Sequence, residues 1–276
     1  MLKPNFKLKK NLVISTVGDE SLHKHWIDCG QYFDTFLVYY GDNKGYENES
    51  RYYQRQKGSK FHLISDAIDS LGSKIDDYDY IWLPDDDVYL EKHDLLRLFH
   101  YMENYDLDLA QPSIIGWYGV EMNLHQQGSL MRFTNWVEIM CPCFSLDALK
   151  KCQNTFKENE CGWSIEGLWN IRLGHPRNKI AIIDDVVAVH TRPVFGGNTY
   201  KTDDPEKEAM AQAKEVYDKH DIGTHYSQDL QFGNPTNGEV YCSVVYSQIK
   251  KDMEFGIAKS DRFWPPCEFM KKWKPE

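Results

Sequence analysis

The sequence predicts an α/β fold, in which an open, mostly parallel sheet is flanked by helices. Apolar runs end at glycine or aspartate, as buried parallel strands do where they reach the edge of a sheet. Segments with helical spacing of apolar residues separate these runs over the first 115 residues. The chain of 276 residues shows no internal repeat and no low-complexity linker, so we expect a single domain over residues 1–276.

Strands and helices alternate in the first part of the chain. The predicted strands are residues 11–19, 34–42, 78–87 and 107–115. The predicted helices are residues 20–30, ended by a glycine, then 60–75 and 91–105. In the second of these helices, apolar residues recur at positions 61, 63, 64, 67, 68 and 71, which is helical spacing. The alternation predicts parallel strands connected by helices.

The second part of the chain is less regular. The predicted strands are residues 135–145 and an apolar segment, 178–193, that an acidic pair interrupts and that ends near His190. The predicted helices are residues 146–159, 161–174 and 205–220. Residues 114–129 have few periodic apolar positions, which indicates a mobile loop. The stretch after the last helix has no firm periodicity.

The composition argues against some classes of function and location. The formal net charge is −10, with 42 acidic against 32 basic residues, so we expect no nucleic-acid partner. Aromatic residues make up 14% of the chain, a surplus that suits stacking on sugars or bases. The apolar run near the start is too short for a membrane span and no secretory cleavage site follows, so we expect a cytoplasmic protein. Seven scattered cysteines favour free thiols in a reducing compartment.

Three adjacent aspartates follow the apolar strand end in "DYIWLPDDDVYL". In an extended chain, Asp85 and Asp87 point to one side and Asp86 to the other. Two carboxylates on one side are hard oxygen ligands suited to Mn²⁺ or Mg²⁺ with a diphosphate. The alternative is an exposed acidic turn that caps the next helix. The buried strand directly before the aspartates favours a cation site.

Two further aspartates fall at strand ends. Asp19 follows the first predicted strand, and Asp42 ends the second. In open α/β sheets, ligands bind beyond the carboxyl ends of the strands. We therefore expect Asp19 and Asp42 to lie near the aspartates of residues 85–87 at one binding site.

Several motifs in the middle of the chain resemble one family. "IWLPDDDVYL", "AQPS", "TNWVEIMCPCFS", "CGWSIEGLWNIRLG" and "IAIIDDVVAVHTRP" occur in this order. Together they resemble a GT-A-type glycosyltransferase and, more narrowly, the DUF707 family of unknown function. The resemblance covers roughly residues 78–197 and implies three regions. These are a nucleotide-binding half at 11–115, an acceptor and metal half at 116–200, and a C-terminal helix with an irregular extension at 201–276.

The resemblance implies a divalent cation, Mn²⁺ or Mg²⁺, that holds a nucleotide-sugar donor. Asp87 would ligate the cation, and Asp85 would share the ligation or contact the ribose. Asp86 is the more ambiguous member of the triplet and is placed on the donor side. His190 would complete the metal shell. Without the family, a single histidine at a strand end is more often a hydrogen-bonded structural residue.

The resemblance also implies where the donor lies. In GT-A folds the end of the first strand holds the nucleoside base, which points to Thr16, Val17 and Asp19. Arg192 and Lys201 could approach the diphosphate, although either side chain could equally be a surface cation. The aromatic residues that could pack against sugar rings are Trp117, Tyr118, Trp136 and Trp163.

Glu166 corresponds to the acidic residue at the start of the acceptor-side helix. An inverting transferase needs one carboxylate to take the proton from the attacking hydroxyl. The neighbouring Trp163 should raise the pKa of Glu166 by desolvation, which suits that role. Glu138 and Asp185 are lesser candidates for the base, and an ordinary exposed glutamate is the alternative.

These inferences together predict a metal-dependent glycosyltransferase. We expect it to move a sugar from a nucleotide-sugar donor to a hydroxyl of a glycan acceptor, with inversion. Among such donors we expect a UDP-sugar. One alternative is a phosphatase of the haloacid-dehalogenase type, whose DxDx[TV] motif superficially matches Asp85 and Asp87. That motif normally follows the first strand, whereas two strand–helix units precede it here. The other alternative is a non-catalytic nucleotide- or sugar-binding protein of the same fold.

Overall fold

A computed structural model describes residues 11–27, 32–43, 45–116, 121–194, 203–221 and 240–245. The strands are β1 (Asn11–Val17), β2 (Phe33–Tyr39), β3 (Tyr52–Arg55), β4 (Tyr80–Trp82), β5 (Val88–Tyr89), β6 (Leu109–Gly116), β7 (Ser129–Thr134), β8 (Cys143–Ser145), β9 (Ile180–His190) and β10 (Val240–Val245). The helices are α1 (Lys60–Leu71), α2 (Lys92–Asn104), α3 (Leu146–Cys152), α4 (Ile165–Arg172) and α5 (Pro205–His220). Short 3₁₀ turns cover His23–His25, Gly72–Asp77, Glu121–Asn123 and Gln153–Thr155.

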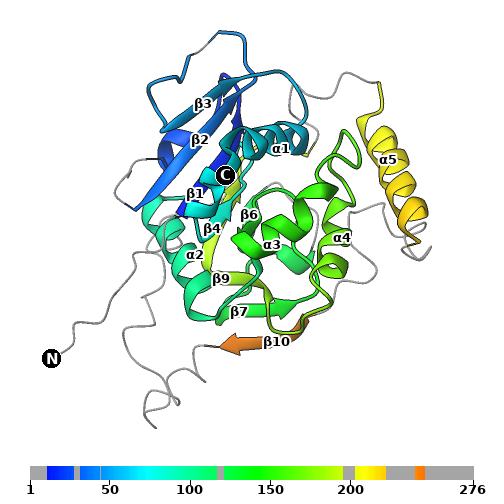
Figure 1. The fold of residues 1–276 in the computed structure, drawn as a ribbon. Helices are drawn as coiled ribbons and strands as arrows, with labels where there is room; N and C mark the ends of the chain where they lie inside the picture. The colour runs from blue at the N-terminus through cyan, green and yellow to red at the C-terminus, as the bar shows by residue number, and fades with distance from the viewer. Residues whose placement is uncertain are drawn as a thin grey trace, which may run out of the picture.

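The described strands form one sheet in the order β10-β7-β9-β6-β8-β4-β1-β2-β3, and β5 pairs with β9 beside this path (Figure 1). Strands β3, β2, β1 and β4 are parallel to one another. Strand β8 lies antiparallel between β4 and β6, so β6 and its parallel neighbour β9 point the same way as β1. Strands β5, β7 and β8 point the other way. The predicted fold class is confirmed.

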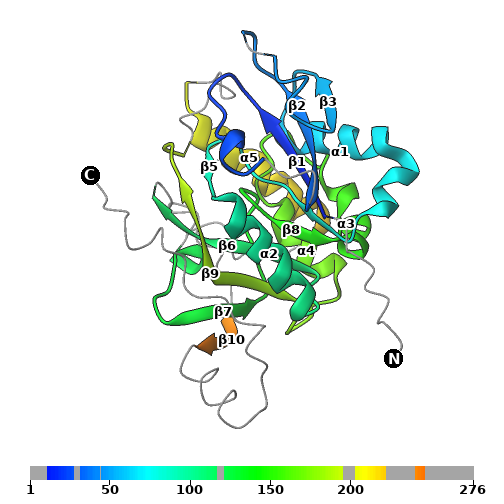
Figure 2. The ribbon, with the colours of Figure 1, turned by 90° about the vertical axis from the view of Figure 1, so that its left-hand side faces the viewer.

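Strand β1 shows why the apolar runs form strands here. Its side chains alternate between the two faces of the sheet, and both faces are covered, so every position after Asn11 is buried, including Ser15 and Thr16. Val13 lies in a core cluster with the leucines of α2. Leu12 and Ile14 lie in a second cluster with residues of α1, α3 and α4. Helix α2 therefore covers one face of the sheet, while α1, α3 and α4 cover the other (Figure 2).

Strand β9 corrects one prediction. The acidic pair was expected to break the segment, yet all positions of β9 are buried in one continuous strand. The pairing of β6 with β9 shifts register there, from Pro112 opposite Ile183 to Ser113 opposite Val187. This bulge takes up the extra residues, including both aspartates, without ending the strand.

Each aspartate of β9 has a buried arginine partner. Arg132 of β7 donates from Nε to Asp184 Oδ2 (2.8 Å) and from Nη2 to Asp184 Oδ1 (2.9 Å). Arg97 of α2 pairs with Asp185, which also accepts from the Tyr101 hydroxyl (2.7 Å). The strand tolerates both acids because each charge is neutralised and hydrogen-bonded inside the core.

Other segments also differ from the prediction. In the described part of the predicted helix 20–30, only the 3₁₀ turn His23–His25 forms, because His23 turns inward and contacts the Ser21 hydroxyl (2.8 Å) and Glu49 (3.1 Å). The predicted strand 135–145 is limited to β8. The predicted helix 60–75 is shorter in the structure, because α1 ends at Leu71 and a 3₁₀ turn, Gly72–Asp77, follows. Strands β3, β5, β7 and β10 were not predicted.

The sheet is continuous from the parallel strands to β9 and β10. The division of the chain at residues 115 and 200 stays a prediction. The C-terminal helix expected at 205–220 is confirmed as α5. Across the described residues, helices long and apolar enough to cross a membrane do not occur.

Candidate active site

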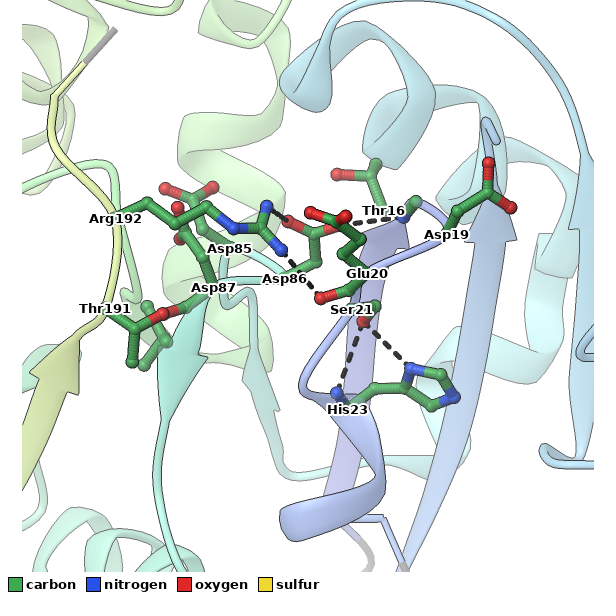
Figure 3. A network of polar contacts seen from close by, with 12 residues as sticks. Thr16, Asp19, Glu20, Ser21, His23, Asp85, Asp86, Asp87, Thr191 and Arg192 are labelled. Atoms are coloured by element: carbon green, nitrogen blue, oxygen red, sulfur yellow. Dashed lines mark hydrogen bonds and ion pairs between the residues drawn. The ribbon is translucent and has the colours of Figure 1, made fainter. Parts of the chain in front are cut away.

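The aspartate turn (Asp85–Asp87) connects β4 to β5 at the carboxyl end of the parallel strands. The segment before β8 holds the turn, because the Asp85 N–H donates to the Met140 carbonyl (2.8 Å). The carboxylates of Asp85 and Asp87 lie together, and that of Asp86 is directed toward the end of β1 (Figure 3). The alternation expected from the sequence is therefore present.

Asp86 is the buried member of the aspartate turn. Its Oδ2 accepts from the Gly18 N–H (2.7 Å) and the Tyr40 hydroxyl (2.9 Å), and its Oδ1 accepts from Arg192 Nη1 (3.4 Å). Arg192 also donates to the Glu20 carbonyl (2.6 Å; Figure 3). Burial raises the pKa of Asp86, while the Gly18 N–H and Arg192 oppose that rise. Asp86 thus joins the ends of β1 and β2 to the segment after β9.

Asp87 lies beside His190. Strand β5 pairs with the end of β9, with Val88 opposite His190, and this places Asp87 Oδ2 3.4 Å from His190 Nε2. Burial favours the neutral acid, but the hydrogen bond and charge of His190 outweigh it and hold the pKa of Asp87 below its usual value. The other oxygen, Oδ1, is buried and has no hydrogen-bond partner within the described structure.

Asp85 is paired with a lysine that was not predicted. Lys60, the first residue of α1, lies 2.7 Å from Asp85 Oδ1. The Asp85 side chain keeps 35% of its exposure, so it remains open to a ligand. Burial, together with the nearby charge of Asp87, raises the pKa of Asp85, and Lys60 opposes the rise.

Two glutamates lie behind the aspartate turn. Glu138 accepts from the Met140 N–H (2.8 Å), and burial followed by the charge of Asp85 raises its pKa to about 7. Glu166 is in the first turn of α4, which the chain enters through Ser164 with φ 79°. Burial raises the pKa of Glu166 to about 8, and the charge of Glu138 adds to this. Each carboxyl therefore exchanges a proton near neutral pH.

One oxygen of the Glu166 carboxyl does not accept a hydrogen bond within the described residues. Its Oε2 is buried without a hydrogen-bond partner in the described residues, although the residue as a whole is only half-buried. A carboxyl with a pKa near neutrality and a vacant acceptor oxygen can take a proton from a hydroxyl placed beside it. The expected desolvation of Glu166 is therefore present in the structure.

The donor-side residues have mixed environments. Thr16 is buried at the end of β1, and the side chain of Val17 packs in the core, so only its backbone is available to a ligand. Asp19 accepts from the Tyr39 hydroxyl (2.5 Å) and from the N–H groups of Asp42 (3.2 Å) and Asn43 (3.1 Å). Its carboxylate thus anchors the loop after β2.

Asp42 is directed to solvent. Its side chain is 77% exposed and forms an ion pair with Lys57 at 2.7 Å. A role for Asp42 in binding a donor stays a prediction, since its hydrogen bonds and its ion pair connect it to Asp19, Arg55 and Lys57 and not to the aspartate turn.

Asp185 is not brought to the site, because Arg97 and Tyr101 hold its carboxylate inside the core under β9. Trp136 is buried and Trp163 is half-buried. Trp117, Tyr118 and Lys201 lie outside the described residues.

The described end of the predicted mobile loop, by contrast, is fixed. Arg132 donates to the carbonyls of Met122 (2.5 Å) and Leu124 (2.9 Å). Asp184 accepts from the Gln126 N–H (3.0 Å). The ion pair of Arg132 and Asp184 therefore anchors residues 122–126 to β9.

Sequence reasoning missed Lys60, which contacts both the aspartate turn and the loop that carries Glu138. One signal was available. A lysine at the first position of a helix opposes the helix dipole, so its charge needs another partner. Tyr40, which donates to Asp86, carried no such signal.

The carboxylate and imidazole groups at the site could supply part of the ligand shell of a divalent cation. The described residues contain no group of three or more His, Cys, Asp and Glu side chains arranged to hold a metal ion. Asp87 and His190 are adjacent, and the buried Asp87 Oδ1 is an unused hard ligand. Mg²⁺-type sites commonly use one or two protein ligands and complete the shell with substrate phosphates and water. The pair fits a site of this partial kind.

Comparisons with known proteins found no matching family model and no matching curated protein. Among solved structures, S. aureus TarS is similar over 75% of this chain and 40% of that chain, with 13% identity and a TM-score of 0.47. TarS 1–349 in complex with UDP-GlcNAc is similar over 76% of this chain and 66% of that chain, with 13% identity and a TM-score of 0.48. The same fragment in complex with UDP has 13% identity, coverages of 76% and 65%, and a TM-score of 0.46.

This chain spans less than two thirds of the length of each of these three TarS chains. At such identity the likeness concerns the fold alone, and with TM-scores below 0.5 we draw no functional conclusion from it. Membership of the DUF707 family stays a prediction.

Proposed function

We propose that this protein is a metal-dependent glycosyltransferase that moves a sugar from a UDP-sugar to a hydroxyl of a glycan acceptor, with inversion. One observation carries the proposal. A carboxylate–histidine pair, Asp87 and His190, lies at the carboxyl end of the parallel strands, and two glutamates with pKa values raised to about 7 and about 8 lie behind it. A cation-binding pair beside protonatable acids suits the transfer of a group from a diphosphate to a hydroxyl.

Asp87 and His190 would hold the cation, Mn²⁺ or Mg²⁺, and Asp85 would share it through Oδ2, because its Oδ1 already contacts Lys60. When bound, the cation would neutralise the charge on the departing diphosphate. The ionised state of Asp87 supports this role, since the neighbouring imidazole already favours the carboxylate form.

The nucleotide would lie over the ends of β1 and β2. Thr16, the backbone of Val17 and the loop held by Asp19 border this region, and Asp42 lies at its exposed edge. Asp86 supports the region from below through the Gly18 N–H and the Tyr40 hydroxyl. Its carboxylate oxygens are engaged with protein groups, so Asp86 would orient the donor side rather than contact the cation.

Glu166 would act as the base. Its carboxylate would take the proton from the acceptor hydroxyl while that oxygen bonds to the anomeric carbon and the bond to the diphosphate oxygen breaks. The unfilled Oε2 and the raised pKa support this assignment. Glu138 is the second candidate, but its Oε2 already accepts from the Met140 N–H.

Calorimetry of UDP with and without MnCl₂ tests the binding part of the proposal. We expect UDP to bind only with Mn²⁺, and the variants Asp87→Ala and His190→Ala to lose that binding. Asp76→Ala, which removes an exposed acid paired with Lys150, is the matched control and should bind as the wild type does. Binding of UDP that is independent of Mn²⁺ would contradict the proposal.

The transfer part is tested with Glu166→Gln. This variant should bind UDP and Mn²⁺ normally and lose sugar transfer, measured with the UDP-sugar that most raises the melting temperature in a panel. Near wild-type turnover would remove Glu166 as the base. Hydrolysis of p-nitrophenyl phosphate that depends on Asp85 would instead favour the phosphatase.

A further inference from the structure

Lys60 makes three polar contacts with its ammonium group. Its Nζ donates to the carbonyls of Ile139 (2.6 Å) and Met140 (2.8 Å) and lies 2.7 Å from Asp85 Oδ1. An ammonium group carries three N–H donors, so these contacts use its full capacity. The side chain is 15% exposed, so little of it remains open to water.

These contacts join three segments that are distant in sequence. Lys60 begins α1, Asp85 begins the aspartate turn, and Ile139 and Met140 belong to the 138–141 turn (Glu138–Cys141). Two more bonds close the network, because Asp85 N–H donates to the Met140 carbonyl and Met140 N–H donates to Glu138 (both 2.8 Å). Lys60 is therefore at the centre of a network that includes two of the site acids.

The position of Lys60 is unfavourable for its own helix. The N-terminus of a helix carries partial positive charge, and cations are stabilised at the other end. The contacts of Lys60 with an acid and two carbonyls offset this. Lys60 therefore stabilises the contacts of the site and does not stabilise the N-terminus of α1.

We propose that Lys60 is a positioning residue of the site described above, an inference that rests on the proposed function. It holds the 138–141 turn against the aspartate turn, which places Glu138. It also offsets the charge of Asp85, so that Asp87 is the principal carboxylate ligand of the cation. Lys60 does not bind the donor phosphates itself, because its donors are already used by the protein.

The test compares Lys60→Met, which keeps the length of the side chain and removes its charge, with Lys60→Arg. Lys157→Met is the matched control, since Lys157 pairs with Asp66 at 2.6 Å on the surface. Hydrogen exchange is followed at the amides of Asp85 and Met140. We expect Lys60→Met to speed exchange at both amides about tenfold, because the turns lose their common anchor. Lys60→Arg should restore part of the protection, and Lys157→Met should leave it unchanged.

The second readout is Mn²⁺ affinity, titrated with MnCl₂ alone. Removing a positive charge next to Asp85 should strengthen Mn²⁺ binding by about tenfold in Lys60→Met, whereas Asp87→Ala should abolish it. A merely structural role would weaken Mn²⁺ binding or leave it unchanged. For sugar transfer, the fall in kcat should be larger than the rise in KM, because Glu138, whose charge acts on the proposed base Glu166, is displaced while the donor side is intact.

The outcomes separate this proposal from the proposed function. If the wild type takes up no Mn²⁺ from MnCl₂ either alone or with UDP, the proposed function is wrong. If wild type binds Mn²⁺ but Lys60→Met leaves both amides protected, the positioning role is overturned. Should Lys60→Met fail to fold, Asp85→Ala tests the same contact, because it removes the carboxylate that Lys60 contacts and should speed exchange at the amide of residue 85, which donates to the Met140 carbonyl.

Discussion

Glu166 offers the sharpest test of the site, through the dependence of stability on pH. Burial raises the pKa of its carboxyl from 4.5 to about 8. The unfolded chain ionises at the lower value, so between the two values the unfolded state gains from ionisation and the folded state does not. For such an acid, stability is fully present below about pH 4.5 and is lost progressively as the pH rises toward 8.

The magnitude follows from the size of the shift. Each pKa unit corresponds to about 1.4 kcal/mol, so at pH 7 the wild type has lost about 3 kcal/mol through this one group. Glutamine cannot ionise, so Glu166→Gln lacks this loss. We expect the free energy of unfolding of the variant, relative to wild type, to rise by about 3 kcal/mol between pH 4.5 and pH 7. For a chain of this length, that is a relative gain of roughly 6–10 °C in melting temperature.

The assay is thermal unfolding of both proteins from pH 4.5 to pH 8 in EDTA, so that no cation alters the site. Glu215→Gln, which replaces an exposed glutamate of α5, is the control and should follow the wild type across the range. If the difference between Glu166→Gln and wild type is the same at pH 5 and pH 8, the fold does not hold this carboxyl protonated. The assignment of Glu166 as a base with a raised pKa would then be refuted.

The remaining predictions concern the core and the cation. Arg132→Met should cost about 3–5 kcal/mol in urea unfolding, because it leaves Asp184 buried and unpaired; Arg51→Met, which breaks an exposed pair, should cost less than about 1 kcal/mol. Gly116→Ala should destabilise the fold by about 1–3 kcal/mol and weaken Mn²⁺ binding, because Gly116 has φ 98° and a Cβ there would lie 2.4 Å from the His190 carbonyl. A normal Mn²⁺ titration of that variant would contradict the link between the two residues. UDP should raise the melting temperature with MnCl₂ and fail to do so after EDTA; an equal rise in EDTA would count against a metal-held donor.

The parallel half of the sheet could be predicted from sequence because its signal is local. Strands β1, β2 and β4 are short apolar runs that are buried on both faces, and α1 and α2 carry clear helical spacing. The missed strands have weaker local signals. Strand β5 has only two residues, which pair with the end of β9, and the predicted strand 135–145 is limited to the three residues of β8, which pair with β4 and β6.

The segment 135–142 shows how tertiary contacts outweigh local pattern. Its apolar residues favoured a strand, but the carbonyls of Ile139 and Met140 accept from Lys60, and the Met140 carbonyl also accepts from the Asp85 N–H. Glu138 binds the Met140 N–H within the same turn. The backbone of this turn is therefore in contact with a lysine 79 residues away from Ile139 along the chain, which a local reading of the sequence does not detect.

The site was partly predictable for the same reason. The placement of Asp85 and Asp87 together was predicted from the alternation of an extended chain, although residues 86 and 87 form a turn, and the pairing of Asp87 with His190 was anticipated through the family resemblance. The partners of Asp19 and Asp86 were not, because they come from the loop after β2, from Tyr40 and from Arg192. Which strand-end acid is free for a ligand depends on these contacts.

Two acidic groups in this chain look alike in sequence and have opposite environments. Asp184 and Asp185, inside β9, each form an ion pair with a buried arginine. Around the aspartate turn, five acids meet only three cationic partners. The acids are Asp85, Asp86, Asp87, Glu138 and Glu166. The partners are Lys60, His190 and Arg192. Burial raises the pKa of both glutamates, and the charge of Asp85 next to Glu138 and that of Glu138 next to Glu166 add to the rise. A divalent cation would relieve the remaining repulsion, so this imbalance supports the proposed cation site more strongly than the aspartate triplet alone does.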